Sequence, residues 1–91
     1  MRTIRYSAQF KKDYKRCVKR GLPLAKLAEV LDYLVKGDAL PPQYRDHQLI
    51  GTYYGHRECH IAPNWLLIYL IKDDELTVTA VRTGSHADLL E

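Results

Sequence analysis

Imidazole side chains are the groups in this sequence best suited to acid–base chemistry. The chain has four histidines, all in its second half: His47, His56, His60 and His86. Because imidazole titrates near pH 6.5, two neighbouring histidines can supply a proton donor and a proton acceptor at neutral pH. RNA cleavage needs such a pair: a base deprotonates the 2′-hydroxyl that attacks the adjacent phosphorus, and an acid protonates the departing 5′ oxygen. A single histidine more often has a structural role. Three histidines on one predicted sheet and its flanking loops favour a catalytic site.

Two arginines are candidates to hold the phosphate in such a reaction. Arg57 and Arg82 fall on predicted strands of the same sheet, where each could bind phosphate oxygens and the charge that builds on them. From spacing alone, an exposed salt bridge on the strand face is an equally good interpretation of each.

A metal site is the competing use of several histidines. The sequence contains no cysteine–histidine cluster, and the nearby carboxylates are only Asp46 and Glu58. We therefore expect chemistry without a metal or another cofactor.

Aromatic side chains could bind unpaired bases by stacking. Trp65 begins a predicted strand, where a tryptophan is more often part of the core, so both readings stay open. Tyr53 and Tyr54 lie between Gly51 and Gly55, and we expect them to be more exposed.

Positive charge is concentrated at the N-terminal end. Residues 1–20 carry eight lysines and arginines against one aspartate, a net charge of +7, whereas the other 71 residues carry six against ten acidic residues, a net charge of −4. This asymmetry favours a polyanionic or acidic partner, although a solvated helix face would look the same. The candidate RNA-binding residues on the first helix are Lys11, Lys12, Lys15, Arg16 and Lys19.

The elements that must position these residues follow from the apolar periodicity. A short strand over 3–6 precedes a helix from Ser7 to about Arg20, with Phe10, Tyr14, Cys17 and Val18 on one stripe. Pro23 and Gly37 bound a second helix. Only about two residues separate the helices, so an antiparallel hairpin is expected.

Strands are predicted over 57–61, 65–72 and 76–82, and His47 is expected in the loop that enters the sheet. The run from Leu66 to Ile71 is apolar without alternation, which indicates a central strand covered on both sides. The fold class is therefore α+β: a helical hairpin on one face of a mostly antiparallel four-stranded sheet, then a short C-terminal tail. Residues 1–91 suffice for one domain.

The cellular location is also constrained. The N-terminus lacks the apolar stretch of a signal peptide, and no segment approaches the length of a membrane span. We interpret Cys17 and Cys59 as reduced thiols that are packed inside the protein. We expect a cytoplasmic protein with no membrane partner.

Three linked motifs resemble the YafQ-type toxins of the RelE superfamily, a family of toxin–antitoxin systems. The motifs are Asp46-His47-x-Leu49-x-Gly51, Arg57-Glu58-x-His60-Ile61-x-Pro63-Asn64-Trp65-Leu66-Leu67-Ile68-Tyr69 and Arg82-Thr83-Gly84-Ser85-His86-Ala87-Asp88-Leu89. They span roughly residues 44–90, and the preceding helices have the expected length and charge.

The resemblance implies a RelE-like fold and a metal-free endoribonuclease that cuts messenger RNA in the ribosomal A site. Its partners would be mRNA, the 70S ribosome and a DinJ/RelB-like ribbon–helix–helix antitoxin, with DNA bound only through the antitoxin. The family's active positions fall on His47, His60, Asn64, Trp65 and His86. We expect His86 as general acid, His47 or His60 as base, Trp65 as a shaping or stacking residue and Arg82 as a phosphate ligand.

The sequence departs from the family at two positions. Asn64 replaces the usual aspartate and cannot take up a proton or stabilise a histidinium by charge. Leu90 replaces an aromatic residue that could hold a base. The alternative hypothesis is therefore a weakened or inactive member that binds RNA or an antitoxin, and a metal-dependent hydrolase is a third.

Overall fold

The computed structural model describes the backbone of residues 1–90 and the side chains of residues 1–89. Strand β1 (Thr3–Tyr6) leads into two helices, α1 (Ala8–Lys19) and α2 (Leu24–Lys36). Four strands follow: β2 (His47–Gln48), β3 (Arg57–Ala62), β4 (Trp65–Lys72) and β5 (Thr77–Gly84). Helix α3 (His86–Leu90) comes last, and single 3-10 turns occupy η1 (Pro42–Tyr44), η2 (Gly51–Tyr53) and η3 (Asp73–Glu75).

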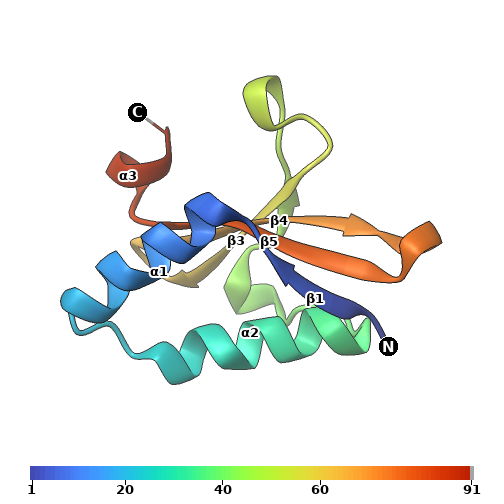
Figure 1. Ribbon diagram of the computed structural model, residues 1–91, viewed down its shortest axis with the longest axis horizontal. Helices are drawn as coiled ribbons and strands as arrows, with labels where there is room; N and C mark the ends of the chain where they lie inside the picture. The colour runs from blue at the N-terminus through green and yellow to red at the C-terminus, as the bar shows by residue number, and fades with distance from the viewer. Residues whose placement is uncertain (91) are drawn as a thin grey trace.

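The strands form one sheet in the order β1-β5-β4-β3-β2 (Figure 1). Strand β1 is parallel to β5, and the other neighbours are antiparallel. The predicted α+β class and mostly antiparallel sheet are confirmed, but the sheet has five strands where four were predicted. The additional strand is β2, which places His47 in the sheet and not in a loop. Its two residues are too few to show the alternation that marks a strand in sequence.

The helices begin and end close to the predicted caps. The Ser7 hydroxyl oxygen accepts a hydrogen bond from the Phe10 N–H at 2.9 Å, and Gly37 ends α2 with a φ of 81°. The predicted apolar stripe of α1 is wrong in part, because Tyr14 and Val18 are 37% and 48% exposed. The α1 residue buried in addition to Phe10 and Cys17 is Asp13.

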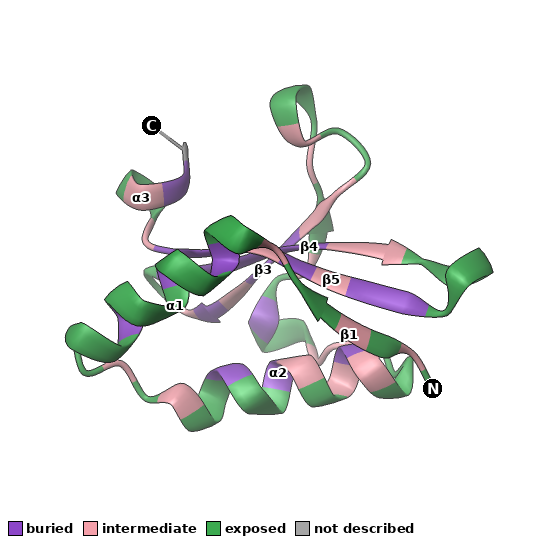
Figure 2. Ribbon diagram, in the orientation of Figure 1, coloured by how far each residue is buried: buried purple, intermediate pink, exposed green. Residues whose placement is uncertain are grey.

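The main apolar core lies between the helices and one face of the sheet (Figure 2). Its largest members are Phe10, Leu27, Leu34, Tyr44, Trp65, Leu67 and Tyr69. Because successive strand residues face opposite sides, Leu66 and Ile68 of β4 point to the other face, where they cluster with Leu89 of α3. Strand β4 is therefore covered on both sides, as its unbroken apolar run predicts.

Both cysteines are packed inside. Cys17 and Cys59 are 1% and 0% exposed. Burial raises the pKa of the Cys59 thiol to about 12, so this thiol stays protonated and apolar in character. In the described part of the chain, no helix combines the length and apolar character needed to cross a membrane.

Candidate active site

Three of the four histidines meet beside the edge formed by β2 and β3. His47 lies on β2, His60 on β3 and His86 at the start of α3. The ring centroid of His60 is 6.2 Å from that of His47 and 5.8 Å from that of His86, so His60 lies between the other two. Helix α3 and the segment around η2 both rise from the side of the sheet away from α2 (Figure 1).

Strand pairing explains how His47 reaches this cluster. His47 pairs with Glu58 across β2 and β3, and Glu58 is two residues from His60, so both β3 side chains face the same side. The register between β3 and β4 shifts between His60 and Ala62, and such irregularities commonly re-aim side chains next to functional sites.

The hydrogen bonds of His47 determine which of its nitrogens carries a proton. Nδ1 lies 2.9 Å from the carbonyl oxygen of Arg45, and because a carbonyl only accepts, Nδ1 must be the donor. Nε2 then faces Glu58 Oε1 at 3.4 Å. Glu58 is 3% exposed, and its other oxygen, Oε2, has no hydrogen-bond partner among the described residues. Sequence reasoning did not place Glu58 in the site, although its spacing from His60 was a signal.

His60 is the histidine best suited to remain neutral. Burial lowers its pKa below the ordinary imidazole value, and neighbouring Arg45, His47 and His86 act in the same direction, against Glu58. Its buried Nδ1 has no hydrogen-bond partner among the described residues. A neutral imidazole at neutral pH can accept a proton.

His86 is oriented by Asn64, from the turn between β3 and β4. The Asn64 amide oxygen lies 3.2 Å from His86 Nδ1 and also accepts the His86 backbone N–H at 3.3 Å. Since this oxygen is an acceptor, Nδ1 carries a hydrogen, and Nε2 is the nitrogen left for a substrate. Asn64 therefore holds the ring and the backbone of His86 through an acceptor that carries no negative charge.

His56 does not join the cluster. It is separated from His60 by three residues, a spacing that brings metal ligands together on a helix but not here, since His56 precedes β3. Its ring packs edge-on against Tyr53 at 5.7 Å. Among residues 1–89, no group of three or more histidine, cysteine or acidic side chains is placed to hold a metal ion.

Trp65 does not stack on a base. It is 2% exposed within the main core, and its indole N–H donates to the Thr83 hydroxyl at 2.9 Å. Burial leaves no ring face open for stacking in this structure, so the core interpretation that the sequence left open fits better, and a site-shaping role remains a proposal. The Leu90 position, expected to affect how a base is held, lies outside the described side chains.

Both candidate phosphate-binding arginines are in internal ion pairs. Arg57 is bound by Asp46, with Nη2 and Oδ2 2.9 Å apart, and the Tyr69 hydroxyl donates to the same carboxylate. Arg82 Nε donates to Asp13 at 2.7 Å. Hydrogen bonding to Asp13 raises the pKa of Arg82, which therefore remains a cation. Both arginines therefore form the salt bridge that the sequence left open as the alternative to phosphate binding.

The basic residues expected to contact RNA are all exposed on α1: Lys11, Lys12, Lys15, Arg16 and Lys19. Arg16 also approaches Asp88 of α3 at 3.3 Å, and Arg20 does so at 2.7 Å. Sequence reasoning missed Asp13 and Asp88, whose long-range partners lie 68 to 72 residues away in the chain.

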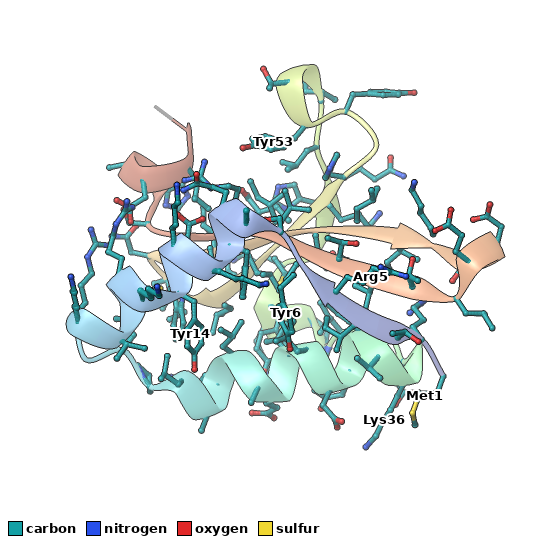
Figure 3. All side chains as sticks on the ribbon, in the orientation of Figure 1. Met1, Arg5, Tyr6, Tyr14, Lys36 and Tyr53 are labelled. Carbon is teal, nitrogen blue, oxygen red and sulfur yellow. The ribbon has the colours of Figure 1, made fainter. Side chains whose placement is uncertain are left out.

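A separate groove of about 600 Å³ lies between α1 and α2. Figure 3 shows Tyr6 and Tyr14, two of its lining residues, pointing toward α2. The groove is lined by aromatic, aliphatic and lysine side chains and by no histidine or carboxylate. The imidazole side chains that could do acid–base chemistry therefore lie in the histidine cluster and not in this groove.

Known proteins resemble this chain over almost its whole length. The mRNA interferase toxin YafQ of Escherichia coli K12 is 40% identical over 89 residues, which cover 97% of this chain and 95% of that protein. The crystal structure of the E. coli DinJ–YafQ complex has a chain with a TM-score of 0.91 and 38% identity, covering 100% of both chains. The crystal structure of a metal-bound toxin from Helicobacter pylori has a TM-score of 0.92 and 45% identity, covering 98% of this chain and 99% of that one.

A family model also matches residues 2–91, and it describes the bacterial toxin of a type II toxin–antitoxin system, YafQ. The match spans the histidine cluster together with the helices that precede it. By sequence, fold and length, this chain belongs to the YafQ family of type II toxin–antitoxin toxins.

Proposed function

We propose that this toxin is a ribosome-dependent endoribonuclease that cuts messenger RNA in the A site by histidine acid–base catalysis, without a metal or cofactor. Residues 1–91 would act as a single RelE-like toxin domain in the cytoplasm. The observation that carries the proposal is the position of His60 between His47 and His86, at ring distances of 6.2 and 5.8 Å. The kinship to the E. coli mRNA interferase supports the choice of RNA as substrate.

In this mechanism His60 is the general base and His86 the general acid. His60 takes the proton of the 2′-hydroxyl, because its lowered pKa keeps it neutral and able to accept. The 2′ oxygen attacks phosphorus, and the P–O5′ bond breaks as His86 Nε2 gives its proton to the leaving oxygen. The products are a 2′,3′-cyclic phosphate and a 5′-hydroxyl.

Cationic groups would stabilise the charge on the phosphate. Arg82 lies in register with Ile68, which is in register with Glu58, so the three form one row across the sheet beside the histidines. Its guanidinium remains charged while Asp13 fixes its direction. His47 is oriented by Arg45 and Glu58 and is the alternative base.

The partners proposed for the toxin are mRNA, the 70S ribosome and an antitoxin. The exposed cations of α1 suit ribosomal RNA phosphates. A DinJ-like ribbon–helix–helix antitoxin is proposed because a structural neighbour was crystallised with DinJ. Operator DNA would be bound only through that antitoxin.

One observation favours a second candidate, a catalytically weakened toxin that still binds RNA or antitoxin. The acceptor at His86 Nδ1 is the uncharged amide oxygen of Asn64. A neutral acceptor orients the ring but gives less stabilisation to a protonated imidazole than a carboxylate does.

Cleavage on programmed ribosomes tests the proposal. His86→Ala should lower kcat by about 100-fold or more and leave the fold intact, because it removes the acid. His56→Ala is the matched control, since that histidine lies outside the cluster, and it should cut like the wild type. Cleavage should survive a chelator. Full activity of His86→Ala would contradict the histidine mechanism. Loss of wild-type cleavage on addition of a chelator would contradict it as well.

A further inference from the structure

Asp88 joins the end of α1 to the turn that carries His86. Its carboxylate accepts hydrogen bonds from Arg20 at 2.7 and 3.3 Å, and Arg16 lies 3.3 Å away. The side chain is only 14% exposed. Arg20 holds the pKa of Asp88 well below its usual range, so the carboxylate is ionised wherever the protein is folded at ordinary pH.

The same carboxylate closes a capping box at the start of α3. Asp88 Oδ2 accepts the Ser85 backbone N–H at 2.9 Å, and the Asp88 N–H donates to the Ser85 hydroxyl at 3.2 Å. His86 and Ala87 lie between the two residues of this box. Gly84 leaves the necessary room, because a Cβ there would lie 2.8 Å from Asp88 Oδ2.

Helix α3 cannot hold this geometry alone. It has five residues, far fewer than an isolated helix needs in water. Its apolar anchor is Leu89, in the small cluster with Leu66 and Ile68. The contacts of Asp88 with Arg20 and Arg16 are the charged links between α3 and the α1 end of the molecule, and the Arg20 contact is the shorter.

We propose that Asp88 is a positioning residue for His86. Through the Ser85 capping box it sets the backbone of α3, and through Arg20 it fixes α3 to the basic helix, so that His86 Nδ1 meets Asn64 and Nε2 faces the substrate. Asp88 itself touches no reacting atom. The role in cleavage rests on the proposed function, whereas the positioning of the ring does not.

Asp88→Asn and Asp88→Ala test this proposal. In the purified toxin, NMR relaxation should show increased motion of residues 85–89, and the His86 ring signals should move toward those of an imidazole that has no fixed hydrogen bond to Asn64. In ribosomal cleavage, kcat should fall by about tenfold with KM unchanged, since small displacements of a catalytic group cost rate and not affinity. Arg20→Gln should act in the same direction, and Arg20→Lys should recover part of the loss.

Asp73→Asn is the matched control. It removes the carboxylate of another arginine pair, Arg2–Asp73 at 2.9 Å, which lies at the tip of the β4–β5 hairpin on the opposite side of the molecule from α3 (Figure 1), and should change neither measurement. Unchanged His86 signals and kcat in Asp88→Asn overturn the proposal, as does a fall in kcat explained entirely by lost folded protein. If the wild type cuts no RNA, the proposed function fails, but the NMR measurement still decides whether Asp88 positions His86.

Discussion

At the scale of single residues, the contact between Asn64 and His86 determines how well the site can keep a protonated acid. The amide oxygen lies 3.2 Å from Nδ1, at the distance where a carboxylate would form a charged hydrogen bond. Asn64→Asp should therefore favour the protonated form of His86 and raise kcat about tenfold, most at alkaline pH. The pH profile of single-turnover cleavage checks this, and an unchanged profile would show that His86 does not act as the acid.

The proposed base, His60, predicts the acidic side of the same pH profile. Its pKa is lowered by burial below the ordinary value of 6.5, so the loss of cleavage caused by protonation of the base should begin only below that pH. The unfolded chain binds a proton at His60 more readily than the folded one, so the His60 contribution to stability is lost as pH falls below about 6.5. Titration of the His60 ring by NMR should show the same lowered midpoint, whereas a midpoint above 6.5 contradicts the assignment.

The position of His60 was predictable from sequence, but most of its surroundings were not. Strand periodicity places His60 on a strand, whereas His47 was expected in a loop and His86 just after the last strand, and only the motif linked the three. The pairing of Asp13 with Arg82 joins residues 69 positions apart, and no local pattern signals such a contact. Trp65 remained open between core and site until its hydrogen bond to Thr83 placed it inside.

At the scale of elements, α1 and its cap are hydrogen-bonded to the edge of β5, just past the β5 residues that pair with β1. Ser7 Oγ donates to the Val81 carbonyl at 2.7 Å, and Asp13 accepts both the Thr83 backbone N–H at 3.2 Å and the Arg82 guanidinium. Asp13 is fully buried and so satisfies a strand edge that would otherwise carry an unpaired donor. This is the reason that a charged residue occupies the inner side of α1.

Asp13→Ala should therefore be strongly destabilising. It leaves the Thr83 N–H and the partly buried Arg82 without their acceptor, which costs about 3 kcal/mol in the free energy of unfolding. Urea denaturation measures the change. Asp32→Asn is the control, because its pair with Lys36 is an exposed contact on α2 that water screens, so the midpoint should hardly change. Similar midpoints for the two variants would contradict this role of Asp13.

Long elements were predictable and short ones were not. The helices over 8–19 and 24–36 and the three long strands follow their periodicity and caps closely. Strand β2 and helix α3 have two and five residues, and tertiary contacts stabilise them more than local propensity does. Both carry a histidine of the cluster, so the site depends on the parts of the fold that sequence patterns describe least well.

At the scale of the whole molecule, the positive charge and the clustered histidines lie on different elements. The first 20 residues carry a net charge of +7, whereas the three clustered histidines come from β2, β3 and α3. In the proposed function, exposed cations on one helix would attract RNA phosphates without regard to sequence, and the histidines would act only on the phosphate brought among them. Binding and chemistry should therefore be separable by mutation.

Replacing Lys11, Lys12 and Lys15 together by glutamine tests this separation. These exposed side chains have no part in the Asp88 contacts, so the histidine geometry should be preserved. We expect KM for programmed ribosomes to rise at least tenfold, the slope of log KM against log salt to fall by about 2, and kcat to stay near the wild-type value. His86→Ala should give the reverse, a lower kcat at unchanged KM. If the triple variant loses kcat and keeps its KM and salt dependence, α1 is part of the catalytic geometry and not the surface that binds RNA.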